Sequence, residues 1–147
     1  MGDKILKDNC KETIELQYEL EHIDDIEKFK QYNQSEFVAT SLSDYLFQLL
    51  IKYELERKDV IKRAELDITY GYQIFDGRKS PKRNKILQLA FGFPLTVEET
   101  QKALKFGGVN ELYVRKKRDA YLMFALARKM TITEVNELLC SEGEELL

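Results

Sequence analysis

Helix-starting signals recur along this chain and constrain its fold more than any other feature of the sequence. Two of them, Thr96 with Glu99 and Thr131 with Glu134, have the capping-box spacing, in which both side chains accept hydrogen bonds from unpaired backbone N–H groups. Three more starts are marked by single cap residues: Ser41 or Ser43, Asp67, and Ser80 before Pro81. Apolar residues recur at helical spacing between the starts, and no long alternating run indicates a strand. We therefore expect an all-α protein of about seven helices without a sheet.

The N-terminal part is expected to be less ordered than the rest. One helix is predicted there, with apolar residues at Ile14, Tyr18, Ile23, Ile26 and Phe29. It is expected to fray around residues 33–35, and residues 1–10 are expected to be disordered. Residues 1–40 are thus interpreted as an acidic, partly disordered arm.

The second half of the chain contains an internal repeat. Residues 83–91 and 95–99 align with residues 118–126 and 130–134, a shift of about 35 residues. Each copy has the pattern of a helix, a short turn and a capped second helix, and such units bury their apolar faces by stacking. Chance similarity between amphipathic helices is the alternative, but the agreement of caps, arginines and alanines favours duplication. We expect stacked helical hairpins here.

Charge is distributed unevenly, although the net charge of the whole chain is only −3. Residues 1–55 carry six Lys and Arg against twelve Asp and Glu, and residues 130–147 carry five acidic residues and no basic one. Residues 56–129 carry seventeen basic against nine acidic residues, a net charge of +8. A basic middle of this kind fits a polyanionic partner, although acidic ends that only solubilise the chain would give the same asymmetry.

Several classes of protein are disfavoured by what the sequence lacks. No apolar run reaches the roughly 18 residues of a membrane span. Cys10 and Cys140 lack metal-ligand spacing, so we expect a reducing, cytoplasmic compartment. His22 is the only histidine and lies among acidic residues, so we expect no enzyme, no cofactor and no metal site. Six aromatic residues are expected in the core rather than around a ligand: Phe91, Phe93, Phe106, Tyr113, Tyr121 and Phe124.

Residues 57–77 have the pattern of two short helices set across one another. The first has an inward face of Val60, Ile61 and Ala64, residues 65–67 form a turn that ends in Asp67, and the second covers residues 68–76 before Gly77. This arrangement can place a second helix in the major groove of DNA.

The stretch from Asp59 to Asp67, continued through Gly77 to Arg83, resembles the XRE (Cro/lambda-repressor-like) helix-turn-helix family. The family's connection, Gly-basic-basic-x-Pro-x followed by Arg or Ser, stands here as Gly77-Arg78-Lys79-Ser80-Pro81-Lys82-Arg83. The resemblance covers residues 41–93 and implies a lambda-repressor-like helix-turn-helix bundle. Residues 94–147 are similar to the helical extension of some XRE-type regulators of Gram-positive bacteria, and we expect one core with the helix-turn-helix domain.

The resemblance also implies which residues contact DNA. The family's base-reading positions fall on Ile68, Thr69, Tyr72 and Gln73, and a Gln side chain suits adenine. Its phosphate contacts fall on Arg78, Lys79, Lys82 and Arg83, with Arg57 and Lys58 beside the preceding helix. Arg115, Lys116 and Lys117 are a further candidate phosphate contact, although a solvated helix start explains them equally well.

We therefore expect a sequence-specific transcriptional regulator that binds double-stranded DNA, as a homodimer on paired half-sites if the resemblance holds. The alternative is a protein-interaction adaptor that keeps the helix-turn-helix fold and uses the aromatic surface at Tyr70 and Tyr72 or the acidic ends. Basic side chains that share a face with the second helix would favour DNA. A face interrupted by Glu65 and Asp76 would favour a protein partner.

Overall fold

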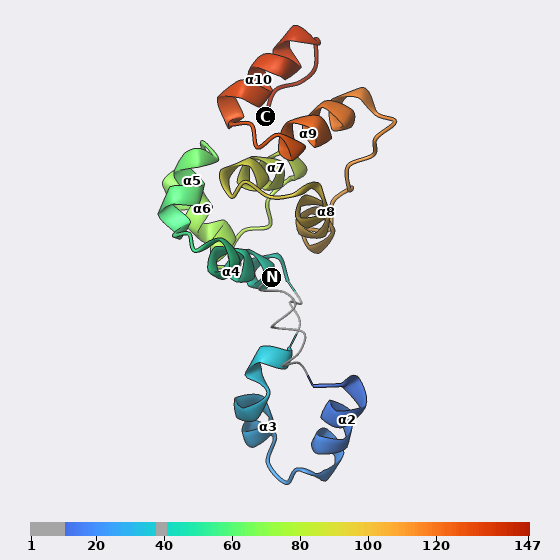
Figure 1. Ribbon diagram of the computed structural model, residues 1–147. Coiled ribbons are helices and arrows are strands. Elements are labelled where there is room, and N and C mark those ends of the chain that lie inside the picture. The colour runs from blue at the N-terminus through green and yellow to red at the C-terminus, as the bar shows by residue number, and fades with distance from the viewer. Residues whose placement is uncertain (1–10, 38–40) are drawn as a thin grey trace. The chain divides into compact units, whose positions relative to one another are not determined.

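A computed structural model describes residues 11–37 and 41–147 (Figure 1). The regular structure of these residues is all helical, with nine α-helices, one short 3-10 helix and no strand. The prediction of an all-α protein is confirmed for this part of the chain. The chain divides into two compact units, residues 1–38 and residues 39–147, and each is described by itself. No helix in the described ranges is long and apolar enough to cross a membrane.

The first unit contains two α-helices instead of the single helix predicted. α2 (Thr13–His22) and α3 (Ile26–Tyr32) are followed by the 3-10 helix η1 (Gln34–Glu36). The break comes just before α3, where the Asp25 side chain accepts a hydrogen bond from the backbone N–H of Glu27 (3.0 Å). The single-helix prediction treated this cap as helix interior.

The apolar residues predicted for the first unit are mostly not buried. Phe29 is buried, whereas Ile14, Tyr18 and Ile26 are exposed. The α-helix ends at Tyr32, next to residues 33–35 where fraying is expected, and Asn33 is buried and hydrogen-bonded to the carbonyl of Phe29 (3.1 Å). The disorder predicted for residues 1–10 lies outside the described residues.

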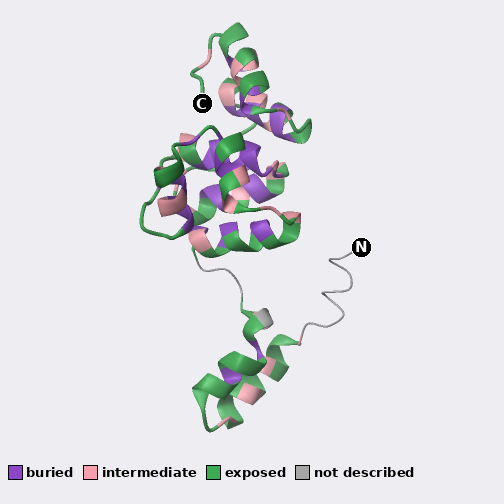
Figure 2. Ribbon diagram, turned by 90° about the vertical axis from the view of Figure 1, so that its left-hand side faces the viewer, coloured by how far each residue is buried: buried purple, intermediate pink, exposed green. Residues whose placement is uncertain are grey.

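The second unit is built from seven α-helices. They are α4 (Leu42–Tyr53), α5 (Arg57–Arg63), α6 (Ile68–Phe75), α7 (Arg83–Gly92), α8 (Val97–Phe106), α9 (Lys117–Ala127) and α10 (Ile132–Ser141). Each contributes buried residues (Figure 2). One core of buried apolar side chains runs through this unit, from Leu42 in α4 to Leu139 in α10.

Most of the predicted helix starts are confirmed. Ser41, rather than Ser43, caps α4 by accepting a hydrogen bond from the backbone N–H of Asp44 (3.1 Å). Asp67 caps α6 in the same way, with the backbone N–H of Tyr70 (3.0 Å). Both predicted capping boxes, at the starts of α8 and α10, are also present.

The start predicted at Ser80 and Pro81 is wrong. α7 begins at Arg83, and its N-cap residue, Lys82, makes no side-chain cap hydrogen bond. Pro81 is buried in the connection between α6 and α7. A proline fits the first turn of a helix or an extended connection equally well, so the sequence alone did not separate the two positions.

The aromatic residues expected in the core are only partly there. Phe91 and Phe93 are buried, whereas Phe106, Tyr113 and Phe124 are exposed. Phe124 instead carries the guanidinium of Arg128 over its ring, 3.5 Å from the ring centroid. Cation–π contact of this kind accommodates an exposed aromatic ring.

Helix α5 packs closely against both α6 and α7 through its inward face. Val60, Ile61 and Ala64 are fully buried. A Cβ atom at Gly71 of α6 would lie 2.7 Å from two side-chain atoms of Ile61, and one at Gly92 of α7 would lie 2.6 Å from the carbonyl oxygen of Val60. The two glycines therefore allow α6 and α7 to approach α5 closely.

The hydrogen bonds of α7 and α8 recur 35 residues later in α9 and α10. Gln101 in α8 clamps the backbone of Leu112 by accepting from its N–H (2.7 Å) and donating to its carbonyl (2.8 Å). Asn136 in α10 makes the same two bonds with Leu147, at 2.8 and 3.5 Å. In each hairpin, a side-chain amide of the second helix thus binds the backbone of a residue 11 positions later.

The turn between α5 and α6 shares one backbone hydrogen bond and one cap hydrogen bond with the turns of these two hairpins. In each turn, the residue before the N-cap donates its N–H to the carbonyl five residues earlier: Leu66 to Ile61 (3.2 Å), Leu95 to Ala90 (2.9 Å) and Met130 to Ala125 (3.1 Å). Each N-cap side chain then accepts from the backbone N–H three residues on. Three successive helix pairs are therefore joined alike.

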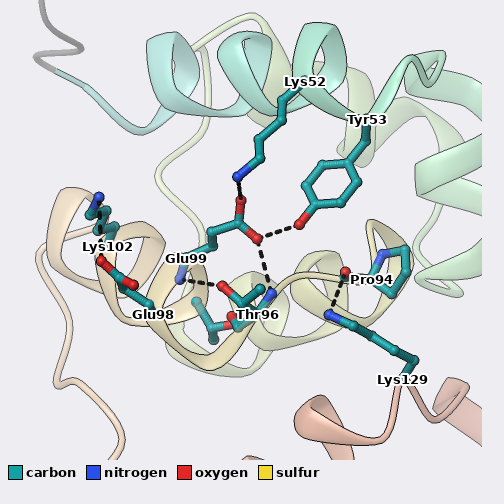
Figure 3. Close-up of polar contacts among 9 residues, drawn as sticks. Lys52, Tyr53, Pro94, Thr96, Glu98, Glu99, Lys102 and Lys129 are labelled. Atoms are coloured by element: carbon teal, nitrogen blue, oxygen red, sulfur yellow. Dashed lines mark hydrogen bonds and ion pairs between the residues drawn. The ribbon is translucent and has the colours of Figure 1, made fainter. Parts of the chain in front are cut away.

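A buried carboxylate ties α4 to α8 (Figure 3). The Glu99 side chain accepts from Lys52 Nζ (2.8 Å), from the hydroxyl of Tyr53 and from the backbone N–H of Thr96 (3.0 Å). Burial alone would raise the pKa of Glu99, but these hydrogen bonds and the charge of Lys52 outweigh it and lower the pKa to about 2. The charged carboxylate therefore belongs to the folded protein at neutral pH.

Replacing Glu99 is expected to remove a pH-dependent part of the stability. Because the folded-state pKa is below the ordinary value of 4.5, the contribution is complete above pH 4.5 and is lost as pH falls toward 2. We expect Glu99→Gln to lower the free energy of unfolding at pH 7 by about 2 kcal/mol. The loss relative to wild type is expected to shrink between pH 4.5 and pH 3 in urea unfolding.

Glu98→Gln is the matched control, because Glu98 is exposed and pairs only loosely with Lys102 (3.9 Å). Its effect is expected to stay within about 0.5 kcal/mol at both pH values. Equal losses for the two variants, or a loss at Glu99 that does not depend on pH, would contradict the assignment.

Gly71→Ala tests the close approach of α5 and α6. Helix propensity alone predicts a gain of about 1 kcal/mol. The contact with Ile61 predicts instead a loss of about 1–3 kcal/mol by overpacking. Ile61→Val, which removes the Cδ1 atom 2.8 Å from the new Cβ, is expected to recover part of that loss in the double variant. A more stable single variant in urea unfolding would show that the two helices are not in tight contact.

Candidate nucleic-acid interface

The four residues predicted to read bases all lie in α6, and its packing decides how far each is accessible. Ile68 and Thr69, in the first turn, are exposed, whereas Tyr72 and Gln73 are half-buried. The opposite side of α6 is anchored by Gly71, Ile74 and Phe75, which are buried. The helix thus presents its N-terminal half to solvent while its other face packs into the core.

The turn before α6 has a left-handed backbone at Glu65, where φ is 55°. Glycine adopts this conformation without steric cost, so a glutamate there is strained to a small degree. Glu65 itself is exposed. Behind it, the carbonyl of Ala64 accepts a hydrogen bond from Gln88 of α7 (3.0 Å), which supplies the buried end of α5 with a partner.

Two of the predicted phosphate contacts, Arg57 and Arg78, converge on one carboxylate. Arg57 Nη1 lies 3.0 Å from Asp76 Oδ1, and Arg78 Nη2 lies 2.9 Å from Asp76 Oδ2. The hydrogen bond from Arg78, together with the charge and hydrogen bond of Arg57, holds the pKa of Asp76 below its usual value. The guanidinium of Arg57 also lies over the ring of Tyr72, 5.0 Å from its centroid, and 5.9 Å from that of Phe47.

The lysines predicted to contact phosphate form fewer ion pairs within the protein than Arg57 and Arg78 do. Lys58 makes an exposed ion pair with Glu56 (3.4 Å). Lys79 and Lys82 are exposed, and no ion pair holds either side chain in the described part of the chain. Lys58 and Lys79 adjoin Arg57 and Arg78 in the sequence, so they add positive charge at the start of α5 and after the end of α6.

Arg83, also predicted to contact phosphate, is bound within the protein. Its guanidinium donates to the carbonyls of Asn110 (2.9 Å) and Glu111 (3.1 Å) and pairs with the buried carboxylate of Asp119 (2.9 Å). The equivalent arginine of the second hairpin, Arg118, donates to the carbonyl of Glu145 (2.8 Å) and to Asn84 (3.0 Å). These contacts fasten the start of α7 to the start of α9.

The basic run of Arg115, Lys116 and Lys117 lies at the start of α9. All three residues are exposed, and among the described residues no ion pair involves them. In Figure 1 the connection between α8 and α9 (residues 107–116) runs along the side of the second unit away from α5 and α6. The basic side chains predicted to share one surface therefore do not all lie beside α6.

Sequence reasoning missed the partners that organise this region. Asp76 was recognised only as a negative charge near the predicted phosphate contacts, and Phe47 was not singled out. Local sequence carries no signal for the contact of Arg57 with Asp76, because 19 residues separate them. The alignment of residues 83–91 with 118–126 did contain a signal for the structural arginines, since both hairpins begin with an arginine followed by Asn or Asp.

The residues of this site hold no cluster suited to a metal ion. No group of three or more His, Cys, Asp or Glu side chains within the described ranges is arranged to bind one. Cys140 is a free, exposed thiol. Comparison with known proteins assigns no family, because no protein-family model, curated protein or solved structure matches the chain.

Proposed function

We propose that this protein is a DNA-binding transcriptional regulator that reads bases through α6 and is not an enzyme. The observation that carries the proposal is the presentation of α6. Its first turn, with Ile68 and Thr69, is exposed, while Gly71 and Phe75 on the other face of the helix pack into the core. A rigidly mounted, exposed helix start that follows a short turn is what insertion into the major groove requires.

The charges around α6 support phosphate contacts on both sides of it. We assign these contacts to Arg57 and Lys58 at the start of α5 and to Arg78 and Lys79 after α6. Lys82 is a further contact of the same kind. Arg83 is left out because its guanidinium is bound within the protein. We place residues 115–117 outside the half-site read by α6.

At the level of the fold, we infer a lambda-repressor-like helix-turn-helix bundle joined to stacked helical hairpins of about 35 residues. The identical turn hydrogen bonds of α5–α6, α7–α8 and α9–α10 support this inference, and so do the paired clamps of Gln101 and Asn136. Two copies on paired half-sites, each presenting one α6, would suit the symmetry of such operators.

A second candidate function is protein binding by the same region. Exposed apolar side chains, Phe47 and Ile51 of α4 and Ile68 of α6, accompany Tyr72 there. Asp76 lies between the two arginines, so the positive surface is interrupted. A folded sample that binds no duplex at low salt would favour this adaptor function over DNA binding.

Gln73→Ala tests base reading. Selection from a randomised duplex pool first provides the preferred sequence, and fluorescence anisotropy then measures affinity. We expect the variant to bind this sequence at least about 10-fold more weakly, because a Gln–adenine pair contributes about 1–3 kcal/mol. Affinity for unrelated duplexes is expected to stay the same. Gln17→Ala, the same change in the first unit, is the control, and equal effects of the two variants would remove Gln73 from the interface.

The double variant Lys58→Ala/Lys79→Ala tests the phosphate contacts. It is expected to weaken binding to all duplexes and to reduce the slope of log affinity against log salt by about 2, since each phosphate contact contributes about 0.9. Lys28→Ala/Lys30→Ala removes the same charge from α3 and is expected to leave the slope unchanged. The assignment fails if both double variants change the slope alike.

A further inference from the structure

Asp76 is an exposed carboxylate that forms ion pairs with two arginines, Arg57 and Arg78. Each of its two carboxylate oxygens binds a different arginine. Arg57 is the first residue of α5, and Arg78 follows the end of α6. Asp76 is exposed, and surface ion pairs contribute little to stability because water and salt screen them. The convergence of two guanidinium groups on one exposed anion therefore calls for a role other than holding the fold.

The two arginines are arranged to hold an oxyanion. Arg57 is fixed at the start of α5 by its position between the rings of Phe47 and Tyr72. The main chain of Arg78 is held by its backbone N–H, which donates to the carbonyl of Gln73 (2.9 Å), and its exposed side chain reaches Asp76 from there. A carboxylate and a phosphate offer similar oxygens to guanidinium groups, which bind both through directed N–H donors. Whatever anion lies here sits beside Tyr72 and Gln73, two of the proposed base-reading residues.

We propose that Asp76 is an internal stand-in for a DNA backbone phosphate. This inference rests on the proposed function. Without DNA, the carboxylate occupies the place between Arg57 and Arg78 that the phosphate takes in the complex. Docking exchanges one anion for the other, so the two arginines gain little on binding and Asp76 lowers the affinity for every duplex. Asp76 is thus an affinity-setting residue that contacts no base.

Asp76→Asn tests the exchange, with Glu65→Gln as the matched control. Both changes remove one negative charge from an exposed residue near α6, but Glu65 forms no ion pair among the described residues. Affinity for a mixed-sequence duplex is measured by fluorescence anisotropy across a salt series. Circular dichroism and thermal unfolding first confirm that both variants are folded.

We expect Asp76→Asn to bind at least about 10-fold more tightly than Glu65→Gln at low salt. The tighter binding is expected to disappear in the background Arg57→Gln/Arg78→Gln, because no guanidinium is then released. The effect of Glu65→Gln, measured relative to its own background, is expected to be the same with and without the two arginines.

The outcomes separate the two proposals. If wild type binds duplex and the two single variants behave alike, or the folded Asp76→Asn variant binds more weakly, Asp76 is no stand-in and the proposed function stands. Tighter binding that persists without the two arginines also overturns the inference. If folded wild type and every variant fail to bind any duplex at low salt, the proposed function falls and the inference falls with it.

Discussion

The close packing of α6 and α7 against α5 is the constraint on which the second unit depends. Ile61 fills the space that a side chain at position 71 would need, and Val60 does the same for position 92. Because glycine stands at both positions, α6 and α7 lie against α5 at a distance that no other residue allows. The glycine in the middle of α6 lowers helix propensity, but it is the condition for mounting α6 with its first turn exposed. Packing therefore outweighs propensity here.

In the two C-terminal hairpins, α7–α8 and α9–α10, polar side chains bind the segments that follow the helices. Gln101 and Asn136 bind the chain that follows each second helix, and Arg83 and Arg118 bind the carbonyls of that chain. Four side chains thus complete backbone hydrogen bonds that would otherwise lack partners at the helix ends. A basic residue in this part of the chain is therefore not automatically a surface for a polyanion, and its charge says little until its partners are known.

Electrostatics around α6 follow the same rule. The +8 charge of residues 56–129 suggested a basic face. Three of the arginines in this segment are already held by carboxylates of the same segment, because Arg57 and Arg78 face Asp76 and Arg83 faces Asp119. The surface beside α6 is a mixture of lysines, an exposed aromatic ring (Phe47) and several carboxylates, among them Glu65, Asp67 and Asp76. Because of this mixture, both DNA binding and protein binding remain candidate functions. They make different predictions for Arg57 and Arg78, the two arginines between which Asp76 lies.

The sequence by itself determined where helices begin, since caps such as Ser41, Asp67 and Thr96 act within three or four residues. It also determined the all-α class and a periodicity of apolar residues that pack in the second unit. It misplaced the start of α7 and merged α2 with α3, because a proline and an aspartate each suit more than one position in a turn. Only the tertiary structure decided which arginines are bound internally and which carboxylate faces Arg57, because those pairs join residues 19 or more positions apart and depend on how the helices pack.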